Sequence, residues 1–398
     1  MKRLNFHLLI FVVLSLALIS SASCSKNMPA TGGKQQLDES KLSSRVRDRL
    51  NKLRERLAGK SGNQQSKYKV AYTKALEHEI GELAGIEIPD NAAKQNGMVL
   101  KEVLRKRDEK RKKIEDFLKD NPEDKPDYDV DQKIIKDVHE ANPDKKLPND
   151  LKSLIAYMPE FDWSDYINGT EIKDQLACNS CWAFATVAAV SCNLEIQSSY
   201  AYSIKIEKKR NFEEMTIEHD DITWYDPSEQ TLLSCIGKKK GSCSGGWPGT
   251  AFNYFITNGL PAWGEEYTGK VDECVDDTEK VRVLAWDYVT KPANMIPSPA
   301  ILKKALLEHG PLVVLVHIDD NFLGYDGGIF DEKNDGPVNH AVLLMGWDDK
   351  EEAWLIQNSW GTDWGEDGMM WIAWNSHSIG QYATWVEASL VDTDKNGR

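Results

Sequence analysis

The sequence has no excess of basic residues. Its 63 Asp and Glu residues outnumber its 49 Lys and Arg residues, which gives a formal net charge of -14 at pH 7. Binding to nucleic-acid phosphates needs a basic surface, so we expect no nucleic-acid partner. Long apolar runs are also scarce, and the run at residues 8–19 is shorter than the roughly 20 residues that a membrane-spanning helix needs. The mature chain is therefore not expected to span a membrane.

Residues 1–23 have the anatomy of a secretory signal peptide. Two basic residues, Lys2 and Arg3, precede the apolar run, and a stretch of small residues follows it. We therefore expect an exported protein that is secreted, periplasmic or lipid-anchored at the cell surface.

Cys24 follows this segment directly. A bacterial lipoprotein signal ends in the same way, and its cysteine becomes lipidated. Such signals usually carry Leu three residues before the cysteine, where this chain has Ser21. Two interpretations stay open: lipidation of Cys24, which would supply a lipid anchor, or ordinary cleavage near Ala22.

Cysteine is sparse, and its odd count leaves at least one thiol outside any disulfide. Export makes disulfides plausible for the others. Cys178 and Cys181 have C-x-x-C spacing, but no second pair with zinc-like spacing follows, so we expect no metal and no other cofactor. The seven cysteines are Cys24, Cys178, Cys181, Cys192, Cys235, Cys243 and Cys274.

Tryptophan is absent before Trp163, and all 13 tryptophans lie from there onward. All cysteines but Cys24 lie in the same part of the chain. The strand-like apolar runs are also found there, at 312–316, 341–347, 354–356 and 369–374. We therefore place a domain boundary near residue 157, between a polar segment at 24–157 and a domain at 158–398.

The polar segment carries helical patterns. Ser40 is a candidate N-cap and Gly59 a candidate stop for a helix whose apolar residues recur at helical spacing: Leu42, Val46, Leu50, Leu53 and Leu57. Similar patterns predict a second helix within 70–83 and a third within 99–118. An apolar stripe on a helix must be buried against something, so we expect this segment to fold.

Cys181 precedes an apolar, alanine-rich run that is typical of a buried helix. A helix N-terminus stabilises a thiolate, although a lone cysteine there is more often an inert core residue. Two further residues favour catalysis, since His340 opens one strand-like run and Asn358 follows another. An imidazolium can hold a thiolate and later protonate a leaving amine, and an amide can fix the imidazole tautomer. Gln175 and the Cys181 amide can then donate hydrogen bonds to a tetrahedral oxyanion.

These residues stand in motifs that resemble those of papain and its relatives. Gln175-Leu-Ala-Cys-Asn-Ser-Cys-Trp-Ala-Phe184 is similar to the family's active-cysteine block, and Asn358-Ser-Trp-Gly361 to its asparagine block. Further landmarks follow the family's order at His340 and at residues 228–235, 243–248 and 325–330. The resemblance covers about 158–396. It implies an α+β, two-lobed fold with a helical left lobe, a β-barrel-like right lobe and an active site in the cleft.

The resemblance implies a cysteine endopeptidase that hydrolyses peptide bonds of protein or peptide substrates through a thioester acyl-enzyme. Relatives that trim dipeptides carry a His-bearing occluding insertion. No His occurs between Phe252 and Ala300, which favours an endopeptidase. Two alternatives stay open: a catalytically inactive binding protein of the same fold, and a transpeptidase that uses the same thioester chemistry.

Substrate-binding residues are also implied by the resemblance. Gly245 and Gly246 would hydrogen-bond the substrate backbone as an extended strand. Trp360 would shield the Asn358–His340 hydrogen bond from water. The pocket for the P2 side chain would be lined by uncharged residues, which favours a medium apolar side chain such as Leu or Val: Trp247, Pro248, Leu315, Val338, Ala341 and Thr384.

The resemblance further implies two disulfides, Cys178–Cys243 and Cys235–Cys274. Asn179 stands where the family usually has Gly, which suggests a backbone at positive φ, where Asn is the next best residue. Extra residues at about 198–225 include two alternating runs that predict a hairpin.

Papain-like relatives carry a helical propeptide that blocks the cleft. By resemblance, residues 24–157 would be a mainly helical pro-region that inhibits the enzyme intramolecularly. Residues 120–148 are poor in pattern and are expected to run extended across the active site, with cleavage near Met158 on activation. The alternative is a charged stalk between a lipid anchor and the enzyme, since the family's propeptide signature is not found.

Overall fold

A computed structural model gives the fold of the described residues, which are 38–60, 65–95, 130–168, 171–200, 203–209, 212–218, 226–261, 266–275 and 280–390, with single positions at 105, 109, 112 and 116. The chain divides into two compact units, Met1–Glu39 and Ser40–Arg398. The predicted signal peptide and Cys24 lie outside the described residues, as does most of the predicted helix at 99–118. No helix in the described ranges is long and apolar enough to cross a membrane.

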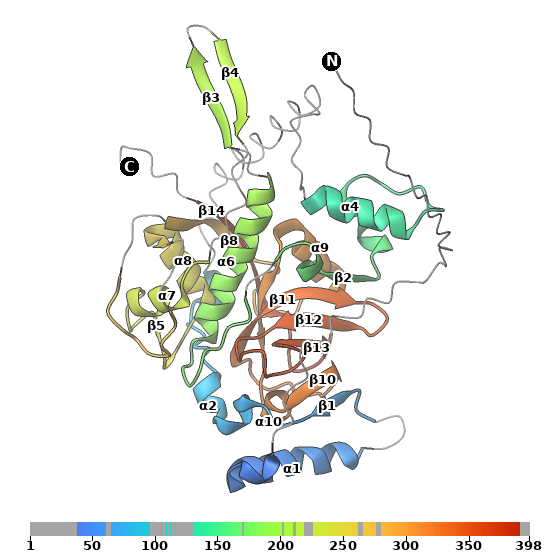
Figure 1. Ribbon diagram of the computed structural model, residues 1–398, viewed down its shortest axis with the longest axis vertical. Helices are drawn as coiled ribbons and strands as arrows, with labels where there is room; N and C mark the ends of the chain where they lie inside the picture. Colours follow the sequence, from blue (N-terminus) through green and yellow to red (C-terminus); the bar gives the residue numbers. More distant parts are fainter. Residues whose placement is uncertain are drawn as a thin grey trace, which may run out of the picture. The chain divides into compact units, whose positions relative to one another are not determined.

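A sheet of ten described strands forms the frame of the second unit (Figure 1). Along the main path the strands follow the order β1-β10-β13-β12-β11-β9-β14-β8-β7, and β2 pairs with β11. Their bounds are β1 Tyr68–Val70, β2 Glu160–Asp162, β7 Leu260–Pro261, β8 Lys280–Tyr288, β9 Leu312–Val316, β10 Tyr325–Phe330, β11 His340–Asp348, β12 Ala353–Gln357, β13 Met369–Ala373 and β14 Gln381–Leu390.

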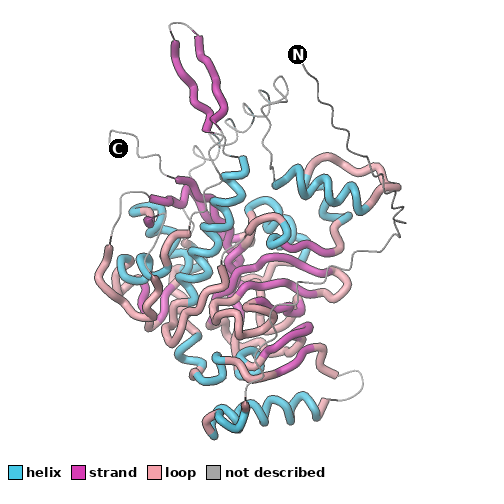
Figure 2. Tube along the Cα trace, viewed as in Figure 1, coloured by secondary structure: helices cyan, strands magenta, loops and turns pink. Residues whose placement is uncertain are grey.

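The predicted strand-like runs all lie in this sheet. Every residue of β9 and β12 is buried, as is all of β11 except its last residue, Asp348. Strands that are apolar along their whole length need cover on both faces, and α6 and α9 supply part of it by contacting β11. Figure 2 shows these strands as neighbouring magenta segments.

The helical lobe is built around α6, which spans Cys181–Tyr200. Its described side chains are buried nearly all round, as expected for a helix that is apolar on every face. Three more helices are α7 (Glu229–Cys235), α8 (Pro248–Asn258) and α9 (Pro299–His309). Of these, α7 and α8 contact α6, whereas α9 lies against β9, β11 and β14. The predicted two-lobed α+β fold is confirmed.

Six tryptophans are among the largest fully buried side chains, which explains the composition change near residue 157. Tryptophan brings a large apolar area into a core, so its absence before Trp163 reflects a smaller core in the N-terminal segment. The six are Trp163, Trp182, Trp286, Trp347, Trp354 and Trp364.

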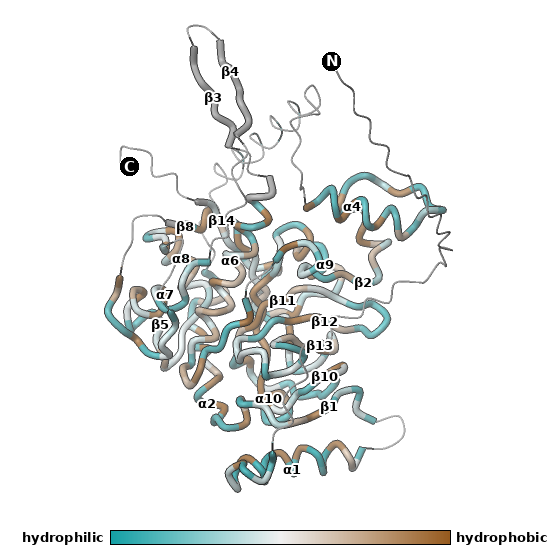
Figure 3. The backbone as a smooth tube through the Cα atoms, in the orientation of Figure 1, coloured by the Kyte–Doolittle hydropathy of each residue, from teal (hydrophilic) through white to brown (hydrophobic). Residues whose placement is uncertain are grey.

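The first predicted helix is confirmed as α1, Ser44–Ala58, with Gly59 as its C-cap. Its N-cap is Ser43 rather than Ser40, because the Ser43 hydroxyl accepts a hydrogen bond from the Val46 amide. Val46, Leu50 and Leu53 are buried. The alternation of brown and teal along α1 in Figure 3 is the predicted apolar stripe.

The predicted second helix is largely wrong. Residues 68–83 form β1, a 3₁₀ turn (η3, Lys74–Glu77) and the short helix α2 (Ile80–Leu83). Tertiary pairing explains the difference. β1 adds to the edge strand β10, and the Thr73 hydroxyl donates to the Leu323 carbonyl at 2.6 Å. Local helical preference is weak compared with such contacts.

Helix α4 (Val130–Ala141) replaces part of the expected extended stretch at 120–148, and α5 (Leu151–Leu154) and η6 (Ile155–Tyr157) follow. The predicted hairpin is present as β3 (Ser203–Lys209) and β4 (Phe212–Glu218). The remaining elements are η1 Glu39–Lys41, η4 Ala92–Lys94, η7 Trp163–Asp165, β5 Gly241–Ser242, β6 Gly245–Gly246 and α10 Asp320–Leu323.

Both expected disulfides are present, Cys178–Cys243 and Cys235–Cys274. Peptide mapping without reduction should therefore recover these two linked pairs. Replacing either pair by serines should lower the free energy of unfolding by about 2–4 kcal/mol, because each bridge restricts the unfolded chain. A disulfide bond formed by the Cys181 sulfur itself would contradict this pairing.

Candidate active site

Cys181 begins α6 and is fully buried. The preceding loop is fixed by the Cys178–Cys243 disulfide and by the Ser180 amide, which donates to the Cys178 carbonyl at 2.7 Å. The amides of Ala341, Gly85 and Trp182 favour the ionised sulfur, but burial outweighs them and raises the pKa of the Cys181 thiol to about 11. In this closed state the thiol is neutral.

His340 is the first residue of β11, and Asn358 follows β12. Antiparallel pairing of these strands brings the two side chains together, with His340 Nε2 2.8 Å from Asn358 Oδ1. The Ser359 amide donates to the same Oδ1 at 2.8 Å, which fixes the Asn358 amide with its oxygen toward the ring. Nε2 is therefore the donor. The Trp360 ring lies 4.9 Å from the imidazole and covers it.

Gln175 joins the same site. Its Nε2 donates to the Cys178 carbonyl at 2.8 Å and to the Leu83 carbonyl at 3.3 Å. Its Oε1 accepts a hydrogen bond from the Ser359 hydroxyl at 2.7 Å. Hydrogen bonds with Ser359 and with the Cys178 carbonyl therefore fix both ends of the Gln175 side-chain amide. The structure brings all four predicted catalytic residues together.

Residues 83–87 of the N-terminal segment lie across this site. The Leu83 carbonyl oxygen accepts from Gln175 and lies 3.1 Å from His340 Nδ1. Because Nε2–H already faces Asn358, a donated hydrogen bond from Nδ1 requires the doubly protonated ring. Burial opposes that state and lowers the pKa of His340 to about 4, although Asn358 and Leu83 favour the charged ring. The expectation that 120–148 run extended across the site is wrong for 130–141, which form α4, and residues 120–129 lie outside the described residues.

The two glycines expected to bind a substrate backbone hold the chain's own backbone instead. The Gly246 amide donates to the Gly85 carbonyl at 2.9 Å, and the Glu87 amide donates to the Gly246 carbonyl at 3.0 Å. Ile86 pairs with Gly246 in parallel. Gly245 has φ of 135°, which favours glycine, and its Cα faces Glu87 and Gly85. This edge therefore accepts an extended peptide.

Gly85 marks the closest approach between the segment and the site. A Cβ on Gly85 would lie 2.1 Å from the Asn179 carbonyl oxygen. The Asn179 side chain donates to the Gly81 carbonyl at 2.7 Å. The expected positive φ at Asn179 is wrong, since Leu176 has it instead, at 52°. Sequence reasoning missed the contact of residues 83–87 with the site. The one signal for it was Gly85, because glycine permits close approach of another backbone.

The residues expected around the P2 pocket are buried and lie on the sheet and at the start of α8. Leu315 of β9 is the register partner of Ala341 of β11. The Thr384 hydroxyl donates to the Tyr382 carbonyl, and the Tyr382 ring meets Trp247 edge-on at 5.0 Å. Pro248 begins α8 and Val338 precedes β11; both are buried.

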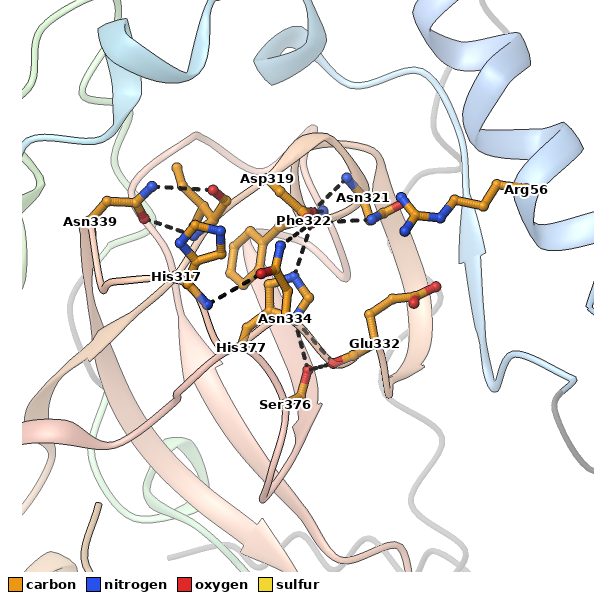
Figure 4. A network of polar contacts seen from close by, with 12 residues as sticks. Arg56, His317, Asp319, Asn321, Phe322, Glu332, Asn334, Asn339, Ser376 and His377 are labelled. Carbon is orange, nitrogen blue, oxygen red and sulfur yellow. Dashed lines mark hydrogen bonds and ion pairs between the residues drawn. The ribbon is translucent and has the colours of Figure 1, made fainter. Parts of the chain in front are cut away.

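A polar network holds the surface on which α1 docks (Figure 4). Asp319 caps α10 by accepting from the Asn321 amide at 2.9 Å. Buried His377 lies below, with Nε2 3.3 Å from Asp319. Burial alone would raise the pKa of Asp319, but the nearby His377 ring and a hydrogen bond from Asn334 hold it well below its ordinary value. Asp319 therefore stays ionised as the cap.

This network supplies hydrogen-bond and ion-pair partners for the N-terminal segment at two places. On α10, Asp320 forms an ion pair with Arg49 of α1. On the other side, the Glu332 carboxylate accepts from the Tyr68 hydroxyl at 2.9 Å and pairs with Lys60, while the Glu332 carbonyl lies 3.1 Å from His377 Nδ1. His377 thus links the two docking points through its two ring nitrogens.

Acid should open the site, because His340 is held neutral by burial. Its ordinary pKa is about 6.5, and in the closed state the pKa is about 4. The contribution of this group to closing is complete above pH 6.5 and is lost as the pH falls toward 4. The opening equilibrium of the full-length Cys181→Ser variant should rise by up to about tenfold per pH unit in this window. Hydrogen exchange of peptides covering 80–95, corrected for intrinsic rates, measures it.

The matched control is Cys181→Ser combined with His340→Gln, which removes the titrating ring and should flatten the pH dependence between 6.5 and 4. An equal slope in both variants would assign the effect to other groups.

Comparison with known proteins agrees with this geometry. A family profile described as papain family cysteine protease matches residues 158–388. The viral cathepsin of Cydia pomonella granulosis virus is 31% identical over 244 residues, which cover 59% of this chain and 64% of the relative. Gamete and mating-type specific protein A of Dictyostelium discoideum is 31% identical over 226 residues, 56% of this chain and 44% of the relative. The match spans less than two thirds of either relative.

Among solved structures, digestive procathepsin L 3 from Tenebrio molitor larval midgut matches with a TM-score of 0.56 at 20% identity, covering 86% of this chain and 90% of that one. At this identity the match supports the fold alone. The family profile covers more than half of the chain and includes Gln175, Cys181, His340 and Asn358. The chain belongs to the papain family of cysteine proteases.

Proposed function

We propose that the chain is a cysteine endopeptidase made as an exported zymogen, with Cys181, His340, Asn358 and Gln175 as its catalytic residues. The observation that carries the proposal is the hydrogen-bonded set of His340, Asn358 and Gln175, with His340 oriented by Asn358 at 2.8 Å and Cys181 at the start of α6. The Leu83 carbonyl lies between His340 Nδ1 and Gln175 Nε2.

The chemistry follows from these positions once residues 83–87 leave. The Cys181 thiolate attacks the scissile carbonyl carbon and forms a C–S bond, while Gln175 Nε2 and the Cys181 amide donate to the oxyanion. The C–N bond then breaks, and the amine leaves with a proton from His340. Water, deprotonated by His340, hydrolyses the thioester and regenerates the thiol. Asn358 keeps the ring aligned through both steps.

Protein and peptide substrates are the proposed partners. Gly245 and Gly246 would bind the substrate backbone, and support comes from the strand-like pairing of Gly246 with Ile86. The apolar residues Leu315 and Ala341 lie side by side near this edge, which favours a medium apolar P2 side chain. The viral cathepsin match also suggests a peptidase, although it covers 64% of that relative.

The N-terminal segment is the proposed intramolecular inhibitor. Residues 40–95 dock through α1 and β1 and carry 83–87 across the catalytic residues. A stalk would not need to occupy the site. Upstream, we propose residues 1–23 as the signal peptide, with Cys24 as the first residue if it is lipidated. The two disulfides fit an oxidising compartment outside the cytosol. We propose residues 158–398 as the catalytic domain.

Replacing the nucleophile tests the chemistry. Cys181→Ala should abolish peptide hydrolysis after removal of the pro-region, because no other thiol lies next to His340 among the described residues. A thiol-directed epoxysuccinyl inhibitor should label Cys181 and no other cysteine, as peptide mapping by mass spectrometry would show. Unchanged hydrolysis by the variant would end the proposal.

Gly85 offers a test of inhibition by the pro-region. Gly85→Ala should speed activation of the full-length protein at least tenfold, because the new Cβ would lie 2.1 Å from the Asn179 carbonyl oxygen. The matched control is Gly81→Ala, four residues earlier in the sequence, where a Cβ meets no atom within 4 Å. The lag before hydrolysis of a fluorogenic peptide gives the rate. Equal lags in the two variants would favour the stalk.

A further inference from the structure

We infer that residues 130–157 remain part of the active enzyme and are not removed with the pro-region. The inference rests on the proposed zymogen. It replaces the expected cleavage near Met158 by a cleavage before Val130, so that the active enzyme begins upstream of α4. Three kinds of observation carry it: burial of apolar side chains, polar contacts with the catalytic domain, and the state of the backbone around Met158.

The α4–α5 segment, residues 130–157, shares the core of the catalytic domain. On α4, Val130, Ile134 and Val138 are buried, and Ile134 is completely inaccessible to solvent. Leu154 at the end of α5 is also fully buried. These side chains belong to the same continuous apolar cluster as Trp163 and the strands of the main sheet, a cluster that also includes Val46 and Leu50 of α1. Removal of the segment would expose the facing apolar surface to water.

Polar contacts tie the same segment to the domain. The Lys133 ammonium lies 4.6 Å from the centre of the Tyr166 ring. Lys152 pairs with Glu308 of α9 at 2.5 Å. In Figure 1, α4 lies near α9 and β2, whereas α1 lies by β1 and α10. None of the contacts described above for the α4–α5 segment involves the catalytic residues, so its retention leaves the site accessible.

The backbone around Met158 is held in place by the sheet. The Met158 carbonyl accepts from the Trp347 indole at 3.0 Å, and the Met158 amide donates to the Ile155 carbonyl at 3.1 Å. The Pro159 carbonyl accepts from the Asp349 amide at 2.8 Å. The next residues form β2, which pairs with β11. A peptidase binds extended, accessible chain, so cleavage here would require the sheet edge to open.

Residues 83–87 differ in this respect. They are held by backbone hydrogen bonds to Gly246 and Asn339, and the exposed Arg45–Glu79 ion pair lies within the N-terminal segment itself. Exposed ion pairs contribute little to stability. One part of the N-terminal region is thus bound as a ligand of the site, and the other is built into the domain.

The first test is the N-terminus of the active form. Full-length protein is activated at acid pH, labelled with a biotinylated epoxysuccinyl inhibitor and captured. Intact mass and N-terminal sequencing of the labelled chain should show a start before Val130. A labelled chain that starts at Val130 or later would overturn the inference, whether or not a fragment stays bound. Failure to label any chain would instead contradict the proposed function.

A second test compares two substitutions on α4 in the activated enzyme. Ile134→Ala should lower its melting temperature by at least about 4 °C, because it leaves a cavity in a shared core. Lys136→Ala is the matched control, since this side chain is 71% exposed, and it should change the melting temperature by less than about 1 °C. If the segment leaves on activation, both activated variants will melt as the wild type does, which would overturn the inference.

Discussion

The position of β11 in the middle of the sheet is the constraint on which the rest of the structure depends. Its pairing with β9 places His340 opposite Val316, and its pairing with β12 returns the chain so that Asn358 meets the imidazole. β2 joins the far end of the same strand. The first residue of β11 therefore works in the cleft, while its last residues anchor the α4–α5 segment through β2. The two ends of β11 therefore support two different parts of the structure, the catalytic residues and the α4–α5 segment.

Desolvation governs the state of the catalytic pair. Cys181 and His340 are fully buried while residues 83–87 are in place, and burial penalises the ionised form of each. A thiol and a neutral imidazole are less reactive than the ion pair. The Leu83 carbonyl adds a second effect, since it accepts from Gln175 Nε2, the donor proposed for the oxyanion. Exclusion of water and occupation of this donor thus suppress catalysis together.

Much of this could be predicted from sequence because the motifs are contiguous. The block from Gln175 to Phe184 identifies the start of a buried helix, and continuous apolar runs identify the central strands. The stripe on α1 is equally clear, since Val46, Leu50, Leu53 and Leu57 recur at helical spacing. In each case local pattern and tertiary environment agree, so reading the pattern is sufficient.

The remaining elements depend on partners distant in the chain. Residues 70–83 have helical spacing, but the edge of β10 offers Tyr68 and its neighbours a pairing that local sequence does not reveal. Gly85 resembles any small residue until the Asn179 carbonyl is placed beside it. Residues 130–141 show little apolar pattern in the sequence, yet burial of Ile134 stabilises a helix there. In all three cases tertiary contacts determine the local structure.

The parallel pairing of Ile86 with Gly246 has a consequence for the enzyme after the chain is cut between residues 95 and 130. While Gln95 and Val130 belong to one chain, residues 83–87 are tethered to the cleft and meet it at an effective concentration on the order of millimolar. A modest affinity is then enough to keep the cleft filled, and every opening is followed by rapid return. After the tether is cut, the same segment competes only at its free concentration, which falls when the protein is diluted. Dilution alone then makes activation irreversible, with no change in any contact at the site.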